Sequence, residues 1–246
     1  MHAEDQDIRL QALGEMASGV LHDLNQSLAI VTGFLDLAQQ ALDDNNAELV
    51  RRRIRLAAQA ANGAAASTQR FLGGARPTLE ANQSVAIGRM LHEIAELTSP
   101  RWGYAAQVEG RTIRVRVETA PGLFVAGESY RLRAALMNLV FNAVDALPLG
   151  GEIALVARRD GERIAIEIAD TGQGMPEEVL ARCFEPFFTT KGSAGAGLGL
   201  AQVIATVRQH SGRIEVDSAE GRGTRFRLSL PASSATDAQR TGAAPS

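Results

Sequence analysis

Two asparagines, Asn138 and Asn142, are the first residues in the chain whose type and spacing suggest chemistry. They are four residues apart, so on a helix their side-chain amides stand on the same face, one turn from each other. A neutral amide oxygen is a suitable ligand for Mg²⁺, an ion that usually retains waters and takes its other ligands from substrate phosphates. The pair therefore suggests a magnesium site. Amides that only hydrogen-bond on a helix surface would explain either residue alone, but not the whole set of motifs described below.

A carboxylate followed by glycines forms the second motif. Asp170 closes a predicted strand just before Gly172 and Gly174. Glycine lets the backbone approach a ligand closely, so the carboxylate of Asp170 can enter a pocket. An isolated Asp-Thr-Gly is more often an ordinary turn. The motif therefore indicates a ligand site only in combination with the other motifs of the chain.

A glycine-rich stretch supplies the third motif. Gly195, Gly197 and Gly199 lead into a helix predicted to begin near Leu198. Backbone N–H groups and the helix dipole at such a start favour a bound triphosphate. Lys191 either adds a point charge to that anion or is a solvated loop lysine, and the sequence leaves both readings open.

An exposed histidine near the start of the chain is a candidate nucleophile. With Leu10, Ala17 and Leu24 at position a of a heptad, His22 falls at position f, on the face opposite the apolar seam. Imidazole with an ordinary pKa near 6.5 is largely neutral and nucleophilic at pH 7. A plain surface histidine and, in the adjacent Asp23, a plain solvated carboxylate are the alternatives.

These motifs, taken in order, resemble those of one known family. Asn138 to Asp145, Asp170 to Met175 and Gly195 to Leu200 together resemble the nucleotide site of the histidine-kinase branch of the Bergerat ATPases. Leu21 to Leu28 resembles the phosphoacceptor box of the same family. The resemblance covers nearly the whole chain, and it implies the core of a sensor histidine kinase.

The resemblance implies ATP and Mg²⁺ as cofactors and a role for each motif. Asn142 would be the metal ligand, Asn138 would support the metal or the phosphates, and Asp170 would accept a hydrogen bond from the adenine amino group. The γ-phosphate would pass to His22, with Asp23 accepting the proton or orienting the ring. From there it would pass to an aspartate of a response-regulator receiver domain, which would dock near His22.

A further segment, Phe184 to Lys191, resembles the F-box of the same family and precedes the glycine-rich lid. We expect its aromatic side chains to be packing residues that position the lid. Cys183 lies beside them, and a buried structural thiol is the ordinary role for such a residue.

Three residues distinguish this chain from relatives with other activities. ATP-hydrolysing relatives place a glutamate at the position of Asn138, and an amide cannot activate water as that carboxylate does, so a gyrase-type ATPase is disfavoured. Ser27 stands where proline is usual, and Gln26 stands where Thr or Asn often assists dephosphorylation. Ser27 is the one feature that favours the alternative function, a catalytically weak nucleotide-binding scaffold.

The elements that must carry these residues can be read from apolar periodicity. Apolar or small residues recur in steps of three and four from Leu10 to Ala41, which predicts a long helix over about residues 5–42. A turn at Asp43 to Asn46 and a second helical pattern from Val50 to Phe71 complete an antiparallel hairpin. A lone hairpin leaves apolar surface in water, so we expect a homodimer with a four-helix bundle.

The remaining chain has a mixed pattern. Helices are predicted over residues 86–97, 128–147 and 198–210, and strands over 112–117, 123–126, 152–159, 163–169, 213–218 and 224–230. Asp160-Gly161 is a hairpin turn between the strands over 152–159 and 163–169, and the last two strands form a second hairpin. The prediction is thus an α+β protein: a helical hairpin for dimerisation and phosphotransfer over 1–76, an α/β sandwich of the Bergerat type over 77–231 with helices on one face of a mixed sheet, and a disordered tail over 232–246.

Composition excludes several other classes. A net charge of −3 and a pI near 5.9 give no electrostatic reason to expect nucleic acid or an anionic membrane as partner. No run reaches the ~18 apolar residues of a membrane span, so we expect a cytoplasmic chain without membrane contact of its own. The basic run at Arg51 to Arg55 is interpreted as a solvated helix face rather than a docking patch.

Overall fold

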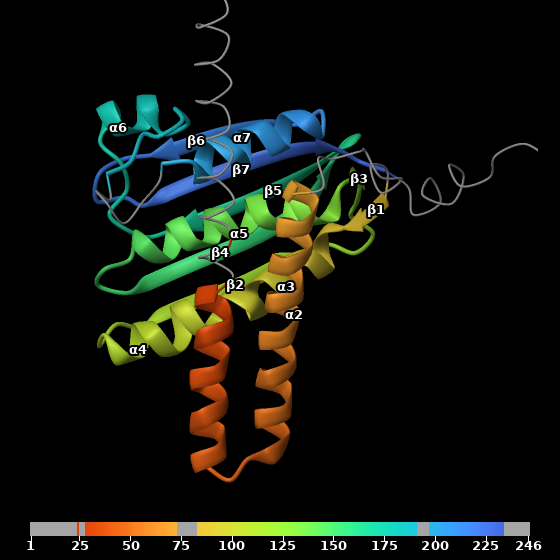
Figure 1. Cartoon of the computed structure of the whole chain (residues 1–246). Helices are drawn as coiled ribbons and strands as arrows, with labels where there is room; N and C mark the ends of the chain where they lie inside the picture. The colour runs from red at the N-terminus through yellow and green to blue at the C-terminus, as the bar shows by residue number, and fades with distance from the viewer. Residues whose placement is uncertain (1–23, 25–27, 73–82, 191–196, 234–246) are drawn as a thin grey trace, which may run out of the picture. The chain divides into compact units, whose positions relative to one another are not determined.

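The computed structural model describes residues 24, 28–72, 83–190 and 197–233. The chain divides into two compact units, one built on a helical hairpin and the other on a β-sheet (Figure 1). The predicted domain boundary at 76–77 lies outside the described residues. Of the tail predicted over 232–246, the first two residues are ordered, because the Ala232 and Ser233 amides donate to the Glu162 and Phe124 carbonyls at 2.9 and 2.7 Å, and residues 234–246 lie outside the described part.

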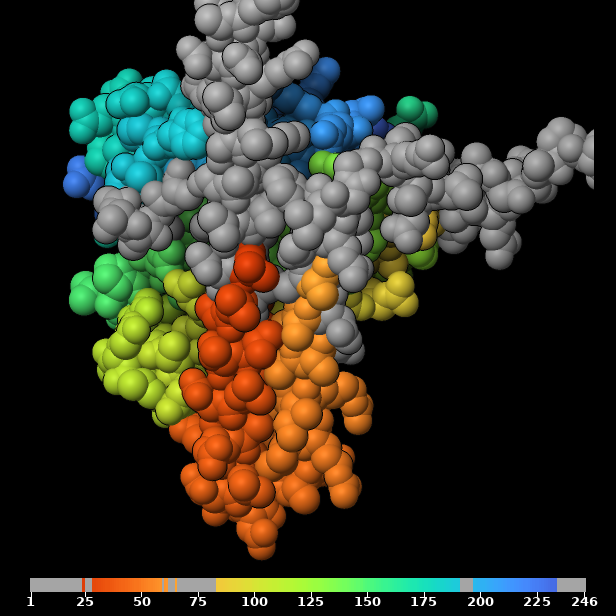
Figure 2. All heavy atoms as spheres, in the orientation of Figure 1, coloured from red at the N-terminus to blue at the C-terminus, as the bar shows by residue number. Residues whose placement is uncertain are grey.

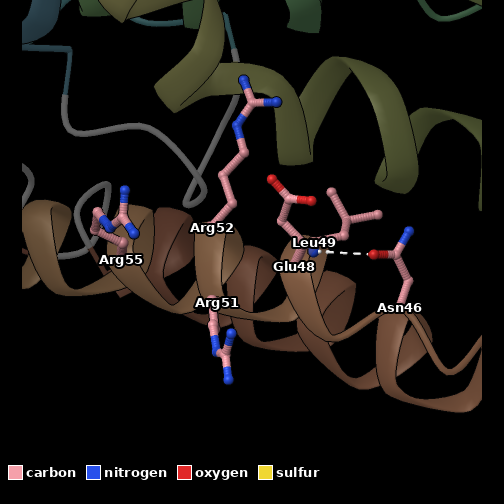
Figure 3. Close-up of a pocket in the computed structure, with 6 residues that line it drawn as sticks. All are labelled: Asn46, Glu48, Leu49, Arg51, Arg52 and Arg55. Atoms are coloured by element: carbon pink, nitrogen blue, oxygen red, sulfur yellow. Dashed lines mark hydrogen bonds between the residues drawn. The ribbon is translucent and has the colours of Figure 1, made fainter.

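The hairpin consists of a helix over residues 28–43 and α2 (Ala47–Leu72). Asn46 caps α2, because its Oδ1 accepts a hydrogen bond from the Leu49 amide at 3.1 Å, as Figure 3 shows. The two helices pack side by side along their length (Figure 2). The predicted turn and second helix are therefore confirmed.

The buried face of the hairpin follows the predicted spacing. Its buried apolar side chains are Ile30, Phe34, Ala38, Ala41 and Ala57. The guanidinium of Arg53 crosses to the other helix and donates a hydrogen bond to the Leu37 carbonyl. Within the basic run Arg51 to Arg55, Arg53 thus links the two helices of the hairpin. Arg51, Arg52 and Arg55 are exposed, as expected.

The second unit contains a five-stranded mixed sheet in the order β2-β4-β5-β7-β6. Its strands are β2 (Ile113–Thr119), β4 (Gly151–Asp160), β5 (Arg163–Asp170), β6 (Arg213–Ser218) and β7 (Thr224–Pro231). Only β2 and β4 pair in parallel, and the other neighbours are antiparallel. The mixed sheet and both antiparallel hairpins were predicted from alternation and from the Asp160-Gly161 turn.

A separate two-stranded sheet departs from the prediction. The strand predicted over 123–126 is β3 (Phe124–Gly127), and it pairs with β1 (Gln83–Ala86) rather than joining the main sheet. β1 has only four residues and begins with two polar side chains, so the sequence pattern gave no strand signal there. The helix predicted from residue 86 begins one residue later as a consequence.

Three helices cover one face of the five-stranded sheet (Figure 1). They are α3 (Ile87–Ser99), α5 (Ser129–Asp145) and α7 (Gly199–Gln209). Inward-facing Ile164, Ile166 and Ile168 of β5 are almost fully buried in the core beneath them, as period-two alternation requires. The predicted helix-covered mixed sheet is confirmed for this unit.

Short helical segments complete the unit. α3 continues into the π-helix η1 (Pro100–Ala105) and α4 (Ala106–Val108), which the sequence pattern did not predict. α6 (Glu177–Arg182) follows Pro176, which is its N-cap rather than its first helical residue. No helix in the described part of the chain is both long and apolar enough to cross a membrane.

Candidate functional site

Helix α5 holds the two asparagines because its apolar face anchors it against the sheet. Leu132, Leu136 and Leu139 are buried, and Asn138 is buried among them with only 3% of its surface exposed. Its Nδ2 donates a long hydrogen bond of 3.4 Å to Oε1 of Gln202 on α7. Its Oδ1 is buried and has no hydrogen-bond partner. An unsatisfied buried acceptor is costly, so this oxygen is suited to a ligand or cation.

Asn142 lies one turn further along α5 and is half-buried. The helix geometry predicted for the pair is therefore confirmed. Both residues come from one rigid, well-packed helix, which restricts where their amides can reach.

Asp170 is the last residue of β5, and two backbone amides hold its side chain in place. Oδ1 accepts hydrogen bonds from the amides of Gly172 at 2.8 Å and Thr224 at 3.3 Å. Among the described residues Oδ2 has no partner, which leaves an acceptor for a ligand. Burial raises the pKa of this carboxyl above its ordinary value of 3.8, against the opposing effect of the two hydrogen bonds.

The glycines after Asp170 pack against the chain's own backbone. A Cβ on Gly172 would lie 2.2 Å from the Ala146 carbonyl oxygen, and one on Gly174 would lie 2.0 Å from that of Ala219. The Gln173 amide also donates to the Ala146 oxygen at 2.9 Å. Ala146 caps the C-terminus of α5, so these contacts join the aspartate motif to the end of the asparagine helix.

Further residues of this corner were missed by the sequence analysis. The Met175 amide donates to Ser218 Oγ at 2.9 Å, and Ser218 Oγ lies 2.9 Å from Thr224 Oγ1. A Cβ on Gly223 would lie 2.0 Å from the Asp170 carbonyl oxygen. The turn Glu-Gly-Arg-Gly before a strand could have indicated a tight turn, but its contact with Asp170 depends on the folded sheet.

The glycine-rich motif is only partly described. Gly197 has a φ of +68°, a conformation that favours glycine, and Gly199 begins α7 right after Leu198. The predicted phosphate-binding residues Lys191 and Gly195 lie outside the described residues. So do the predicted phosphoacceptor His22 and its neighbour Asp23.

The segment before the lid contains both packed and exposed aromatic residues. Phe184 packs edge-to-face on Phe226 with ring centroids 6.3 Å apart, and the Arg182 guanidinium lies 4.3 Å from the centre of the Phe188 ring. Phe187 is 49% exposed with a φ of +66°, contrary to the expectation that all of these aromatics pack. Cys183 is buried as expected, and burial raises the pKa of its thiol to about 11.

A buried histidine ties the far ends of the two site helices together. His210 follows α7, and its Nδ1 donates to the Thr206 carbonyl at 2.8 Å. Its Nε2 accepts a hydrogen bond from the amide of Glu128, the N-cap of α5, at 3.0 Å. This histidine is therefore structural.

The hairpin carries a separate hollow, shown in Figure 3. Its lining residues are Asn46, Glu48, Leu49, Arg51, Arg52 and Arg55. The side chains of Arg51 and Arg52 point to opposite sides of α2 (Figure 3). They therefore form no convergent cluster of cations, in line with the solvated face predicted for this run.

The residues around Asp170 and α5 fit a nucleotide with its metal ion. The buried Oδ1 of Asn138 is a hard oxygen of the kind that Mg²⁺ accepts, and Oδ2 of Asp170 is an acceptor for an amino group. No group of three or more His, Cys, Asp or Glu side chains in the described part could hold a metal by itself. A magnesium ion here would therefore take most of its ligands from phosphates and water.

Comparison with known proteins gives concordant matches. The family model described as histidine kinase-, DNA gyrase B- and HSP90-like ATPase matches residues 127–234. Sporulation kinase A of Bacillus subtilis is 29% identical over 231 residues, covering 91% of this chain and 35% of that protein. Sensor histidine kinase ZraS of Escherichia coli K12 is 31% identical over 227 residues, covering 91% of this chain and 46% of that protein. The chain spans about a quarter to a half of the length of such relatives.

Solved structures agree with these matches. The mycobacterial sensor histidine kinase MprB superposes with a TM-score of 0.54 at 28% identity, covering 62% of this chain and 99% of that one. ShkA, solved full-length in complex with AMPPNP, superposes with a TM-score of 0.56 at 26% identity, covering 90% of this chain and 46% of that one.

Proposed function

The chain belongs to the sensor histidine kinases, with a C-terminal ATPase domain of the Bergerat type, and we propose that it transfers the γ-phosphate of ATP to its own His22. From His22 the phosphate passes to an aspartate of a response-regulator receiver domain, and the reaction takes place in the cytoplasm. The homologues' names support the kinase assignment, and the chemistry of the described site residues supports the roles given to Asn138 and Asp170.

One observation carries the nucleotide part of the proposal. Asp170 and the asparagine helix meet at a single corner, where Gly172 contacts the Ala146 carbonyl one turn beyond Asn142. This corner offers the second carboxylate oxygen of the half-buried Asp170 and, two turns along α5, the buried and unpartnered amide oxygen of Asn138. Asp170 lies at the C-terminal end of α5, and the two asparagines follow along the same helix. This arrangement fits adenine recognition at Asp170 and binding of the metal and phosphates at Asn138 and Asn142.

The residues divide the work of phosphoryl transfer. Asp170 accepts a hydrogen bond from the adenine amino group, while its second oxygen stays fixed by the Gly172 and Thr224 amides. Asn142 and Asn138 direct amide oxygens toward the metal side of the triphosphate. Bound Mg²⁺ supplies charge neutralisation of the transferring phosphoryl group.

The glycine-rich motif and the hairpin complete the reaction. Gly195, Gly197 and Gly199 bring backbone N–H groups to the phosphates, and Lys191 adds a positive charge. On the hairpin, a neutral ring nitrogen of His22 attacks the γ-phosphorus as the bond to the bridging oxygen of ADP breaks, and Asp23 orients the ring or accepts its proton.

Exposed leucines on the hairpin support a homodimer. Leu28, Leu35 and Leu42 recur every seven residues along the helix over 28–43 and are 51%, 49% and 61% exposed. Ile54 on α2 is 50% exposed. A heptad stripe left uncovered by the second helix of its own hairpin is typical of a coiled-coil-like contact with another copy.

Incubation with γ-labelled ATP and Mg²⁺ tests the kinase against its alternatives. A label on the protein that is labile in acid and stable in alkali is expected for phosphohistidine. ATP binding without any label would instead indicate a nucleotide-binding scaffold, and steady phosphate release without label would indicate a gyrase-type ATPase. The absence of a catalytic glutamate at Asn138 makes the last result the less expected one.

A further inference from the structure

The amide of Asn138 is held at one end only. Its nitrogen donates to Oε1 of Gln202 at 3.4 Å, and its oxygen is buried without a partner. The two ends of an amide differ chemically, since the oxygen only accepts hydrogen bonds or binds cations and the –NH₂ group only donates. Which end faces the nucleotide therefore decides whether Asn138 attracts or repels a cation.

Gln202 is the side chain coupled to this choice. In the observed pair its Oε1 accepts from Nδ2 of Asn138, so flipping the Asn138 amide alone would set two oxygens against each other. The flipped state would also turn the –NH₂ group toward the metal side of the site. In the observed orientation Oδ1 of Asn138 is the atom that remains for a cation or its water.

Gln202 itself is held by the packing of α7. Val203 and Val207 of the same helix are fully buried in the core, and His210 ties the end of α7 to the start of α5. The half-buried Gln202 side chain thus approaches Asn138 from a helix whose position on α5 is fixed. No motif in the sequence indicated this contact, because the two residues are 64 positions apart.

We infer that Gln202 is a positioning residue that orients the Asn138 amide oxygen toward Mg²⁺ and so sets the magnesium requirement of nucleotide binding. The inference rests on the proposed function, because it assumes that the nucleotide binds with its metal beside α5. Gln202 acts through Asn138 and contacts neither the metal nor the phosphates itself.

Two substitutions of similar size separate this role from simple packing. Gln202→Met fills nearly the same volume but removes the oxygen acceptor, whereas Gln202→Glu keeps an oxygen at that place. Gln209→Met, at an exposed position of α7, controls for the loss of a glutamine on the same helix. Isothermal titration of the full chain with AMPPNP, in EDTA and at a series of Mg²⁺ concentrations, gives the Mg²⁺ midpoint for each protein.

The expected result is a change in the magnesium midpoint alone. Q202M should raise it by about fivefold, the equivalent of one ordinary hydrogen bond, while its AMPPNP affinity in EDTA stays at the wild-type value. Q202E and Q209M should keep the midpoint at or below that of the wild type. Thermal unfolding of all four proteins should confirm equal folding.

Other outcomes would overturn one claim or the other. If wild-type binding depends on Mg²⁺ but Q202M leaves the midpoint unchanged, or Q202E raises it as much as Q202M, the role of Gln202 is refuted. Equal losses of affinity in EDTA and in Mg²⁺ would also refute it, since they would indicate general damage to the site. If the wild type binds no AMPPNP under any condition, the proposed function fails instead.

Discussion

The carboxylate of Asp170 and the backbone amide of Thr224 are joined by a hydrogen bond of 3.3 Å across 54 positions of sequence. Asp170 ends β5 and Thr224 begins β7, and the two residues are directly paired in the antiparallel ladder. The side chain that we assign to adenine recognition is therefore fixed by the central pair of strands. Its orientation depends on the sheet rather than on the flanking loop alone.

Replacing Asp170 with Asn should separate nucleotide binding from folding. The variant keeps an oxygen for the two backbone amides but loses the charged acceptor for adenine, so its affinity for ATP should fall by about 10- to 100-fold. Because burial raises the pKa of Asp170, the ionised form is disfavoured in the folded protein, and the unliganded variant should unfold at an equal or higher temperature than the wild type. Isothermal titration and thermal unfolding measure the two effects. A variant with wild-type affinity would contradict the adenine role.

The same raised pKa predicts a pH dependence. The folded Asp170 carboxyl binds its proton more tightly than the unfolded chain does, so its contribution to stability is present at acid pH and is lost as pH rises through the raised pKa. The stability advantage of Asp170→Asn over the wild type should therefore be small near pH 4 and larger at pH 7. Urea denaturation at both pH values measures this difference, and an advantage that shrinks with rising pH would contradict it.

Two glycines in one turn form a matched pair for testing the contact with Asp170. Gly221 and Gly223 have similar φ values of +72° and +78°. A Cβ added at Gly221 would meet no atom within 4 Å, whereas one added at Gly223 would lie 2.0 Å from the backbone carbonyl oxygen of Asp170. Gly221→Ala should cost only the strain of a left-handed residue, about 1–2 kcal/mol. Gly223→Ala should cost roughly 1–3 kcal/mol more because the backbones must move apart. Equal losses in urea denaturation would refute the close contact.

How much of this corner the sequence could predict depends on the range of each interaction. The helix of Asn138 and Asn142 and the strand that ends at Asp170 follow from local periodicity, and both are confirmed. The Asn138 contact with Gln202 and the Asp170 contact with Thr224 join distant positions, and no local pattern indicates them. Both became apparent only with the packing of α7 on α5 and of β7 on β5.

The fold shows the same division. The mixed sheet was predicted because its strands alternate and its hairpins carry turn residues. β1 was missed because its four residues gain their structure only from pairing with β3. The π-helix η1 was missed because it continues α3 through Pro100, a residue that local rules place at a helix boundary.

The stripe of exposed leucines on the hairpin, Leu28, Leu35 and Leu42, predicts a homodimer. A charged residue introduced into this stripe should dissociate it. The wild type should have twice the 26.1 kDa mass of a single chain in light scattering at micromolar concentration. Leu35→Glu removes an apolar contact from both copies and adds a charge to each, which should raise the dissociation constant by about 100-fold or more. Gln40→Glu adds the same charge at an exposed position of that helix away from the leucine stripe and should remain dimeric. A dimer that survives Leu35→Glu would place the interface elsewhere.

The most direct test of the central claim is the identity of the phosphorylated residue. Wild type, His22→Gln and, as a control, His92→Gln are incubated with γ-labelled ATP and Mg²⁺, and AMPPNP affinity is measured in parallel. His92 is an exposed histidine of α3. We expect an acid-labile, alkali-stable label on the wild type and His92→Gln, and no label on His22→Gln despite unchanged AMPPNP affinity. Unchanged labelling of His22→Gln would contradict the account.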